Sequence, residues 1–233
     1  MPFLFYDPTW IILLPAIILS IWASANVKST FGKYSRMYNR FGLTGADAAR
    51  KILDMNGLYD VRIERISGEL TDNYDPRTNV VHLSESTYSS QSVAAVGVAA
   101  HEVGHAIQHA TGYSPIKVRN AIVPAVNVCN MLSMPIILLG IILSYNQPLV
   151  DLGIILFSAT VLFQLITLPV EFNASSRALR TLEGQNILAP DEMQGASKVL
   201  RAAALTYVAA ALSSLLSLLR LILIFGGNRN SRD

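Results

Sequence analysis

The sequence predicts a mainly α-helical integral membrane protein, with about four transmembrane helices and one small α+β part. Of its 233 residues, 52% are hydrophobic and only 15% are charged, and the mean hydropathy is +0.40. Several apolar runs reach the roughly 20 residues that a helix needs to cross about 30 Å of hydrocarbon. The net charge of +2, with no basic run interleaved with aromatics, excludes nucleic acid as a partner and leaves membrane lipid.

The first apolar run, residues 8–27, predicts the first span. It carries no charge, and Trp10 and Trp22 lie near its ends, as aromatic anchors do at membrane interfaces. A cleaved signal peptide is the alternative, because Ala23-Ser24-Ala25 imitates a cleavage site. The preceding leader MPFLFYD has no positive charge, however, and this favours a retained span.

The stretch after this span is basic. It holds Lys28, Lys33, Arg36 and Arg40 before its first acidic residue, Asp47. Positive residues next to a span favour the cytoplasmic side. We therefore expect the N-terminus to lie outside the cell and residues 28–120 to lie in the cytoplasm.

Three short elements are predicted before the next long helix. Residues 43–53 form an amphipathic helix, with Thr44 as its N-cap, and residues 61–66 and 79–83 form two strands. We interpret 79–83 as an edge strand that could bind an extended peptide by strand addition. His82 on this strand is either a half-exposed strand histidine or a substrate contact.

The next helix carries the motif His101-Glu102-Val103-Gly104-His105. Residues 90–110 contain no proline, are rich in Ala and Val, and end before Gly112. On a helix, His101 and His105 lie one turn apart on one face and can bind one metal ion, while Glu102 can take a proton from a metal-bound water. This predicts one zinc ion in a small zincin-like catalytic part; buried core histidines are the alternative.

An antiparallel transmembrane hairpin is predicted at residues 121–170. Its two arms are apolar, and the connecting turn 145–148 contains no Lys or Arg, which places the turn outside. The hairpin therefore returns to the side that it left. It brings the residues after 170 back near the histidine motif.

The region 171–202 is expected to supply the third zinc ligand. Glu171 is favoured because it follows the returning span at once. The remaining candidates are the other acidic residues of the region, Glu183, Asp191 and Glu192. Acidic residues in a first helical turn are also common without a metal, because they favour the helix dipole.

Three further polar residues are candidates for supporting roles. His109 lies one turn after His105 and could be structural, lie behind the ligands or help metal to enter. Ser175, one turn beyond Glu171, could hydrogen-bond a ligand histidine, as groups around metal ligands commonly do. Arg177 is either a solvated or membrane-surface charge or a contact for the substrate or its oxyanion.

The last apolar segment, residues 203–226, predicts a fourth helix that spans the membrane or lies at its interface. Arg220 is near enough to its end to reach the interface. Four spans imply an external C-terminus, whereas Arg229 and Arg232 in the tail favour the cytoplasm. The side of the C-terminus stays open.

The segments AAHEVGHAIQH, TDNYDPRTNVVHLS and VEFNASSRAL resemble the YugP-like family of neutral zinc metallopeptidases of bacterial membranes, over nearly the whole chain. The sequence is similar, more distantly, to the membrane protease HtpX and the CAAX prenyl proteases. The resemblance implies a gluzincin-type site, with His101, His105 and Glu171 as zinc ligands and Glu102 as the base. Those relatives usually have Asp four residues after the ligand glutamate, where this chain has Ser175.

Together these observations predict a multi-pass zinc endopeptidase of the bacterial cell membrane, folded as a single domain over 1–233, with its active site facing the cytoplasm. The family resemblance implies membrane-associated or misfolded proteins as substrates. The alternative is a non-catalytic membrane scaffold, in which zinc joins the helices and His109 is the fourth ligand. The oligomeric state is not determined by the sequence.

Overall fold

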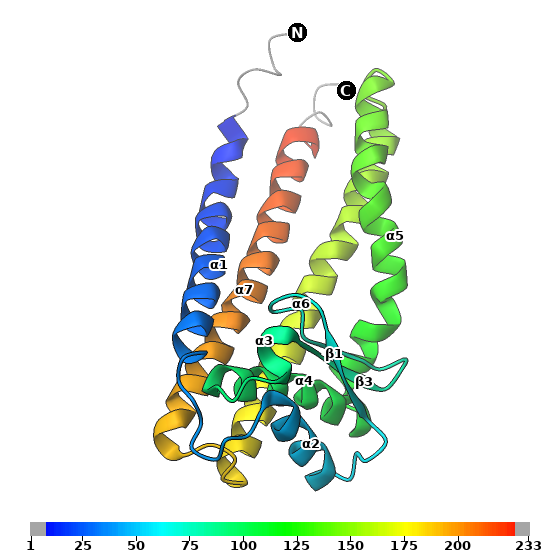
Figure 1. Ribbon diagram of the computed structural model, residues 1–233. Coiled ribbons are helices and arrows are strands. Elements are labelled where there is room, and N and C mark those ends of the chain that lie inside the picture. Colours follow the sequence, from blue (N-terminus) through cyan, green and yellow to red (C-terminus); the bar gives the residue numbers. More distant parts are fainter. Residues whose placement is uncertain (1–7, 227–233) are drawn as a thin grey trace. The chain divides into compact units, whose positions relative to one another are not determined.

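The computed structural model describes residues 8–226 (Figure 1). The leader before Pro8, and the tail charges Arg229 and Arg232, lie outside the described residues. The chain divides into two compact units. The span unit contains 118–168 together with the described residues up to 22 and from 207 onward, and the site unit contains 23–117 and 169–206.

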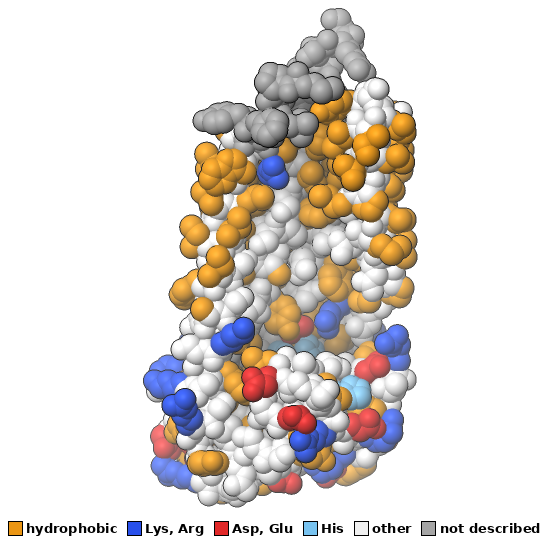
Figure 2. Space-filling view, turned by 45° about the horizontal axis from the view of Figure 1, so that its top comes forward, with side chains coloured by type: hydrophobic (Ala, Val, Ile, Leu, Met, Phe, Trp, Pro, Cys, Tyr) orange, Lys and Arg blue, Asp and Glu red, His pale blue; other side chains and the backbone are white. Residues whose placement is uncertain are grey.

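Long apolar helices make up the span unit and continue into the site unit. They are α1 (Leu14–Tyr34, preceded by the 3-10 turn η1, Pro8–Leu13), α5 (Ser114–Ile142), α6 (Gln147–Gly184) and α7 (Pro190–Gly226). Each is long and apolar enough to cross a membrane, which confirms the expected four spans among the described residues. Figure 2 shows hydrophobic side chains over much of their surface. Exposed examples are Ile21, Leu138 and Ile155.

Small residues allow the long helices to pack closely. Ser20 Oγ lies 3.2 Å from Ser213 Oγ, which joins α1 to α7. Between α5 and α6, a Cβ added to Gly153 would lie 2.9 Å from the carbonyl oxygen of Ser133. Glycine and serine at such contacts are typical of helix packing in membranes, where close backbone approach replaces the hydrophobic effect.

Two helices extend beyond the apolar runs that the sequence marks. Helix α6 continues through Pro169 to Gly184, so Glu171 lies inside it. A proline removes one backbone hydrogen bond and strains the turn before it, but neighbouring turns can hold the helix together. Helix α7 begins at Pro190, and its first turns therefore include residues that precede the apolar run from 203.

The site unit adds three shorter helices and a sheet, namely α2 (Gly45–Met55), α3 (Glu85–Tyr88), α4 (Val93–Ala110), β1 (Arg62–Ile66), β2 (Asn73–Asp75) and β3 (Val80–Ser84). The predicted N-cap Thr44 and the predicted helix end at Gly112 are confirmed. Thr44 accepts a hydrogen bond from the Asp47 N–H, and Ser92 accepts one from the Ala95 N–H. Gly112 has φ +69°, the left-handed conformation that ends α4.

The strand order is β1-β3-β2, so the prediction that residues 79–83 form an edge strand is wrong. β3 is central, parallel to β1 and antiparallel to β2. The third strand, β2, lies between the two strands that the sequence predicted. Alternation of side chains does not distinguish an edge from a centre, whereas the nearly complete burial of Val80, Val81 and Leu83 is typical of a central strand.

The core of the site unit surrounds α4. Val81 and Leu83 of β3 pack in one apolar cluster with Val96 and Val103 of α4, and Leu53 of α2 joins them. Helix α4 is buried along nearly its whole length, as expected for a helix that is apolar on every side. Its buried polar residues are therefore the exceptions that require partners.

Candidate metal centre

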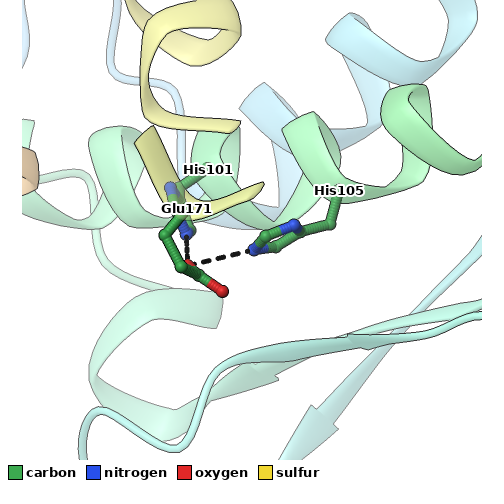
Figure 3. A group of neighbouring side chains, drawn as sticks. All are labelled: His101, His105 and Glu171. Carbon is green, nitrogen blue, oxygen red and sulfur yellow. Dashed lines mark hydrogen bonds and ion pairs between the residues drawn. The ribbon is translucent and has the colours of Figure 1, made fainter. Parts of the chain in front are cut away.

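Three side chains from two helices meet inside the site unit. His101 and His105 extend from α4, and Glu171 extends toward them from α6 (Figure 3). Glu171 Oε2 lies 3.2 Å from His101 Nε2 and 3.4 Å from His105 Nε2. All three residues are buried, and their potential ligand atoms lie within 4.8 Å of one another. This buried cluster could hold a metal ion.

The spacing of these atoms fits zinc. With metal-to-ligand distances of about 2.0–2.2 Å and tetrahedral angles, neighbouring ligand atoms are about 3.3 Å apart. The two distances to Glu171 Oε2, 3.2 and 3.4 Å, agree with this separation. Two imidazoles and one carboxylate are also a common donor set of catalytic zinc sites.

The surroundings of His105 also favour a cation at this point. Its Nδ1 lies 3.0 Å from Gln108 Oε1, and its Nε2 faces Glu171 Oε2, so both ring nitrogens face acceptors. A neutral imidazole has only one N–H to donate. Either a second proton on the ring or a metal ion beside Nε2 resolves this conflict.

Burial and the neighbouring carboxylate of Glu171 shift the pKa of His105 in opposite directions. Burial alone lowers the pKa of the imidazole, but contact with Glu171 outweighs it, so the pKa of His105 is raised above 6.5. In the metal-free protein, the ring therefore keeps its second proton to a higher pH than an exposed histidine does.

A glycine allows α4 and α6 to approach closely at the centre. A Cβ added to Gly104 would lie 2.7 Å from the carbonyl oxygen of Ala174, closer than real contacts permit. Gly104 lies within the histidine motif, and Ala174 lies between Glu171 and Ser175 on α6. The glycine, which has no Cβ, thus permits the close approach that brings Glu171 to both histidines.

Glu102 supplies a further carboxyl group beside the cluster. The residue is buried, with 8% of its surface exposed. Burial raises the pKa of Glu102; His101 and His105 oppose this shift, and the charges of Glu171 and Asp72 add to it. A carboxyl group with a raised pKa holds a proton more readily, as a general base must after taking one.

Each histidine has a different partner behind it. Ser175 Oγ lies 3.1 Å from His101 Nδ1, and Gln108 Oε1 lies 3.0 Å from His105 Nδ1. Ser175 was predicted from the sequence as a partner of a ligand histidine, whereas Gln108 was not. The available signal was its spacing, because a residue three positions after His105 lies on the same side of the helix.

Comparisons with known proteins agree with this geometry. Residues 9–226 match the family model described as "Putative neutral zinc metallopeptidase". The chain belongs to this zinc metallopeptidase family. It is 52% identical over 220 residues to the "Putative membrane protease YugP" of Bacillus subtilis (strain 168), covering 94% of this chain and 96% of that protein. No solved structure matches the chain at a significant level.

Family membership and the four apolar helices support a membrane metallopeptidase. The other acidic residues considered as ligands lie elsewhere. Glu183 is exposed, and Asp191 is bound to Arg40 at 2.8 Å. Glu192 is buried, but its carboxylate accepts hydrogen bonds from the backbone N–H groups of Arg40 and Ala189. Among the described residues, the group of His, Cys, Asp and Glu side chains that could hold a metal ion is therefore His101, His105 and Glu171.

His109 and His82 lie outside the cluster. His109 is exposed, and its Nδ1 lies 3.1 Å from the hydroxyl of Tyr74. Burial, with the nearby carboxylates Asp60 and Asp75, raises the pKa of Tyr74 to about 12, so this hydroxyl keeps its proton. His82 alternates along β3 with the core residues Val81 and Leu83 and therefore points to the opposite face of the sheet.

Arg177 lies behind the cluster on α6. Its Nε donates to Asn173 Oδ1 at 2.8 Å, and its guanidinium carbon lies 5.8 Å from the centre of the Tyr113 ring. Asn173 Oδ1 also accepts a hydrogen bond from Gln108 Nε2 at 3.0 Å. Arg177 is thus connected to His105 through two amide side chains.

Proposed function

We propose that this chain is an integral-membrane zinc endopeptidase that hydrolyses peptide bonds of membrane-associated or misfolded proteins. The observation that carries the proposal is the group of three buried ligands with Glu102 beside it. Three protein ligands are the arrangement of catalytic zinc sites, which keep one coordination position for water or substrate.

His101, His105 and Glu171 would hold one zinc ion through the two Nε2 atoms and Oε2. Bound there, zinc supplies a Lewis acid that polarises the scissile carbonyl and lowers the pKa of water to about 7. The residues around the ligands orient the rings and keep bulk water out of the cluster.

Glu102 would act as the general base and then as the general acid. Its carboxylate takes the proton of the attacking water and later returns it to the amine that leaves when the peptide bond breaks. Proton transfer of this kind contributes about 10²–10⁴ in rate. The raised pKa of Glu102 supports this role, because the protonated form is stabilised between the two transfers.

A structural zinc site in a scaffold protein would need a fourth protein ligand. His109 was the candidate for this ligand, but its Nδ1 contacts Tyr74 and its side chain is exposed. No fourth His, Cys, Asp or Glu joins the group within residues 8–226. The geometry therefore favours catalysis over scaffolding.

Because β3 is the central strand of the sheet, we assign peptide binding to the edge strand β2 instead. β2 pairs with β3 on one side only, and Tyr74 in it contacts His109 of α4. The carboxylate of Asp72, just before β2, acts on the pKa of Glu102 and therefore lies near the base. A peptide added to the outer edge of β2 would gain main-chain hydrogen bonds largely independent of its sequence.

We further propose that the active site faces the cytoplasm of a bacterial cell. Lys28, Lys33, Arg36 and Arg40 directly follow the first span, whereas the α5–α6 turn, residues 143–146, has no Lys or Arg. This asymmetry supports an internal position for the segments that carry His101, His105 and Glu171.

The catalytic proposal is tested with Glu102→Gln. Purified in detergent, this variant should bind zinc in a 1:1 ratio but cleave an unfolded, fluorescently labelled protein at least about 10²-fold more slowly than wild type. Glu69→Gln, a change at an exposed carboxylate of the β1–β2 loop, is the matched control and should cleave normally. Full cleavage by Glu102→Gln would contradict the mechanism.

Orientation is tested by cysteine labelling in intact cells. Cys129→Ser removes the single native cysteine, and Tyr59→Cys or Ser144→Cys then introduces one in the site unit or in the α5–α6 turn. A maleimide that cannot cross membranes should label position 144 and leave position 59 unlabelled until the cells are opened. The reverse pattern would place the active site outside.

A further inference from the structure

Gln108 is completely buried, and each of its polar atoms has a partner. Its Nε2 donates to the carbonyl oxygen of Val170 at 2.8 Å and to Asn173 Oδ1 at 3.0 Å, and its Oε1 faces His105 Nδ1 at 3.0 Å. An amide has two possible orientations, related by a flip, and only its hydrogen-bond partners decide between them.

The first fixed partner is the Val170 carbonyl. A backbone carbonyl only accepts hydrogen bonds, so the NH₂ of Gln108 must face it. Flipping Gln108 would direct Oε1 at this oxygen and leave two buried acceptors in contact, which is costly inside a protein. Val170 therefore fixes Gln108 Oε1 toward His105.

The second fixed partner is Arg177. A guanidinium only donates hydrogen bonds, so Asn173 must direct Oδ1, and not its NH₂, toward Arg177 Nε at 2.8 Å. The same oxygen then accepts from Gln108 Nε2. Arg177 thus fixes Asn173, and Asn173 supports the orientation of Gln108 that Val170 already requires.

We propose that Arg177, Asn173 and Gln108 form a relay that fixes His105 with a proton on Nδ1, so that the Nε2 lone pair is free to bind the zinc ion that Glu171 would also hold. They are positioning residues, since each acts through the next one on the imidazole. The proposal deepens the proposed function, on whose zinc site it rests, by assigning Arg177 to the support of a ligand and not to the substrate.

The relay predicts that an acceptor at position 173 matters more than the size of the side chain. Asn173→Asp keeps an acceptor for both Gln108 Nε2 and Arg177 Nε, whereas Asn173→Leu has a similar size and no acceptor. Position 173 is only partly buried, so both variants should fold. Gln108→Leu removes the contact with His105 itself and gives the largest effect.

The experiment measures zinc affinity of the purified full-length variants by competition with a chelator. We expect Gln108→Leu to bind zinc about 10–100-fold more weakly, as is usual when a group behind a ligand is lost. Asn173→Leu should lose about tenfold, and Asn173→Asp should stay close to wild type. Arg177→Gln should weaken binding, whereas the matched control Arg180→Gln, at a more exposed guanidinium bonded to the Ser176 carbonyl, should not.

A second readout is the proton position on His105 in ¹⁵N-histidine NMR spectra, with His105→Gln assigning the signal. Zinc-bound wild type and Asn173→Asp should show a proton on Nδ1 with nitrogen-bound zinc at Nε2, and Gln108→Leu should show an altered Nδ1 signal. Equal zinc affinity for Asn173→Leu and Asn173→Asp, with unchanged spectra, would overturn the relay. Failure of wild-type zinc protein to cleave peptides would instead contradict the proposed function and leave these results intact.

Discussion

His101 and His105 face the same carboxylate oxygen but are held by different kinds of partner. Behind His105 lies Gln108, a buried amide on the same helix, α4, and its orientation is fixed by the Val170 carbonyl and by Asn173, both on α6. Behind His101 stands Ser175, a hydroxyl on α6 that can rotate, donate or accept. The half of the centre around His105 thus has its direct partner on α4, whereas the half around His101 has its direct partner across the contact between α4 and α6.

This difference indicates where the centre is vulnerable. Glu171 serves both histidines, so its loss should affect both equally. A change that separates the two helices should first remove the Ser175 contact, and a change within α4 should first affect His105.

Glu171→Gln should have the largest effect, because it removes the charged oxygen shared by both rings. We expect zinc content near zero after dialysis and a loss of affinity greater than the 10–100-fold usual for groups behind ligands. Metal analysis of the purified protein provides the measurement. Glu183→Gln, at an exposed position of the same helix, is the control and should keep one zinc ion; a zinc-free Glu183→Gln would revive that residue as the ligand.

Gly104→Ala should separate α4 from α6, because the new Cβ would lie 2.7 Å from the Ala174 carbonyl oxygen. Overpacking of this kind costs about 1–3 kcal/mol in the free energy of unfolding. Gly97→Ala is the matched control, since its new Cβ would meet Ala196 at 3.4 Å and the change gains up to about 1 kcal/mol of helix propensity.

Denaturant unfolding in detergent compares the two glycine variants, and ¹⁵N-histidine spectra report the rings. In Gly104→Ala the His101 signal should change more than the His105 signal, since the direct partner of His101, Ser175, lies on α6, whereas the direct partner of His105, Gln108, lies on α4. Equal changes in both rings would show that the two halves are not independent.

Ser175→Ala should weaken zinc binding less than Gln108→Leu, by about tenfold or less, because a rotating hydroxyl fixes its partner weakly. Ser175→Asp would replace it with an acceptor-only group and should strengthen binding by orienting His101 Nδ1–H. Chelator competition measures both. If Ser175→Ala weakened binding more than Gln108→Leu, the order of the two supports would be reversed.

The pH dependence of the metal-free protein should be the smallest effect. Because the folded-state pKa of His105 is raised, its contribution to stability is complete below about pH 6.5 and is lost as pH rises through the folded value. The raised pKa of Glu102 acts in the same direction, from about pH 4.5 upward. The midpoint of thermal unfolding, measured with a chelator present, should therefore fall between mildly acidic and mildly alkaline pH.

His105→Gln supplies the control for this titration. It removes the imidazole and should make the thermal midpoint less dependent on pH in the same range. A midpoint of the metal-free wild type that rises with pH would contradict the raised pKa of His105.

The sequence by itself was sufficient for the local and compositional features. Thr44 and Gly112 marked helix ends correctly, because capping depends on residues close in the chain. The apolar runs marked four spans, because spanning depends on length and hydropathy. The spacing of His101 and His105 placed two side chains on one face, because a helix turns every 3.6 residues.

Only the tertiary structure decided what depends on residues far apart in the chain. It made β3 central and β2 an edge, since strand pairing joins residues whose separation no local pattern records. It brought Glu171, and not Glu183 or Glu192, to the histidines through the close contact of Gly104 with Ala174. It also joined Gln108 to Asn173, because the orientation of a buried amide depends on every donor and acceptor around it.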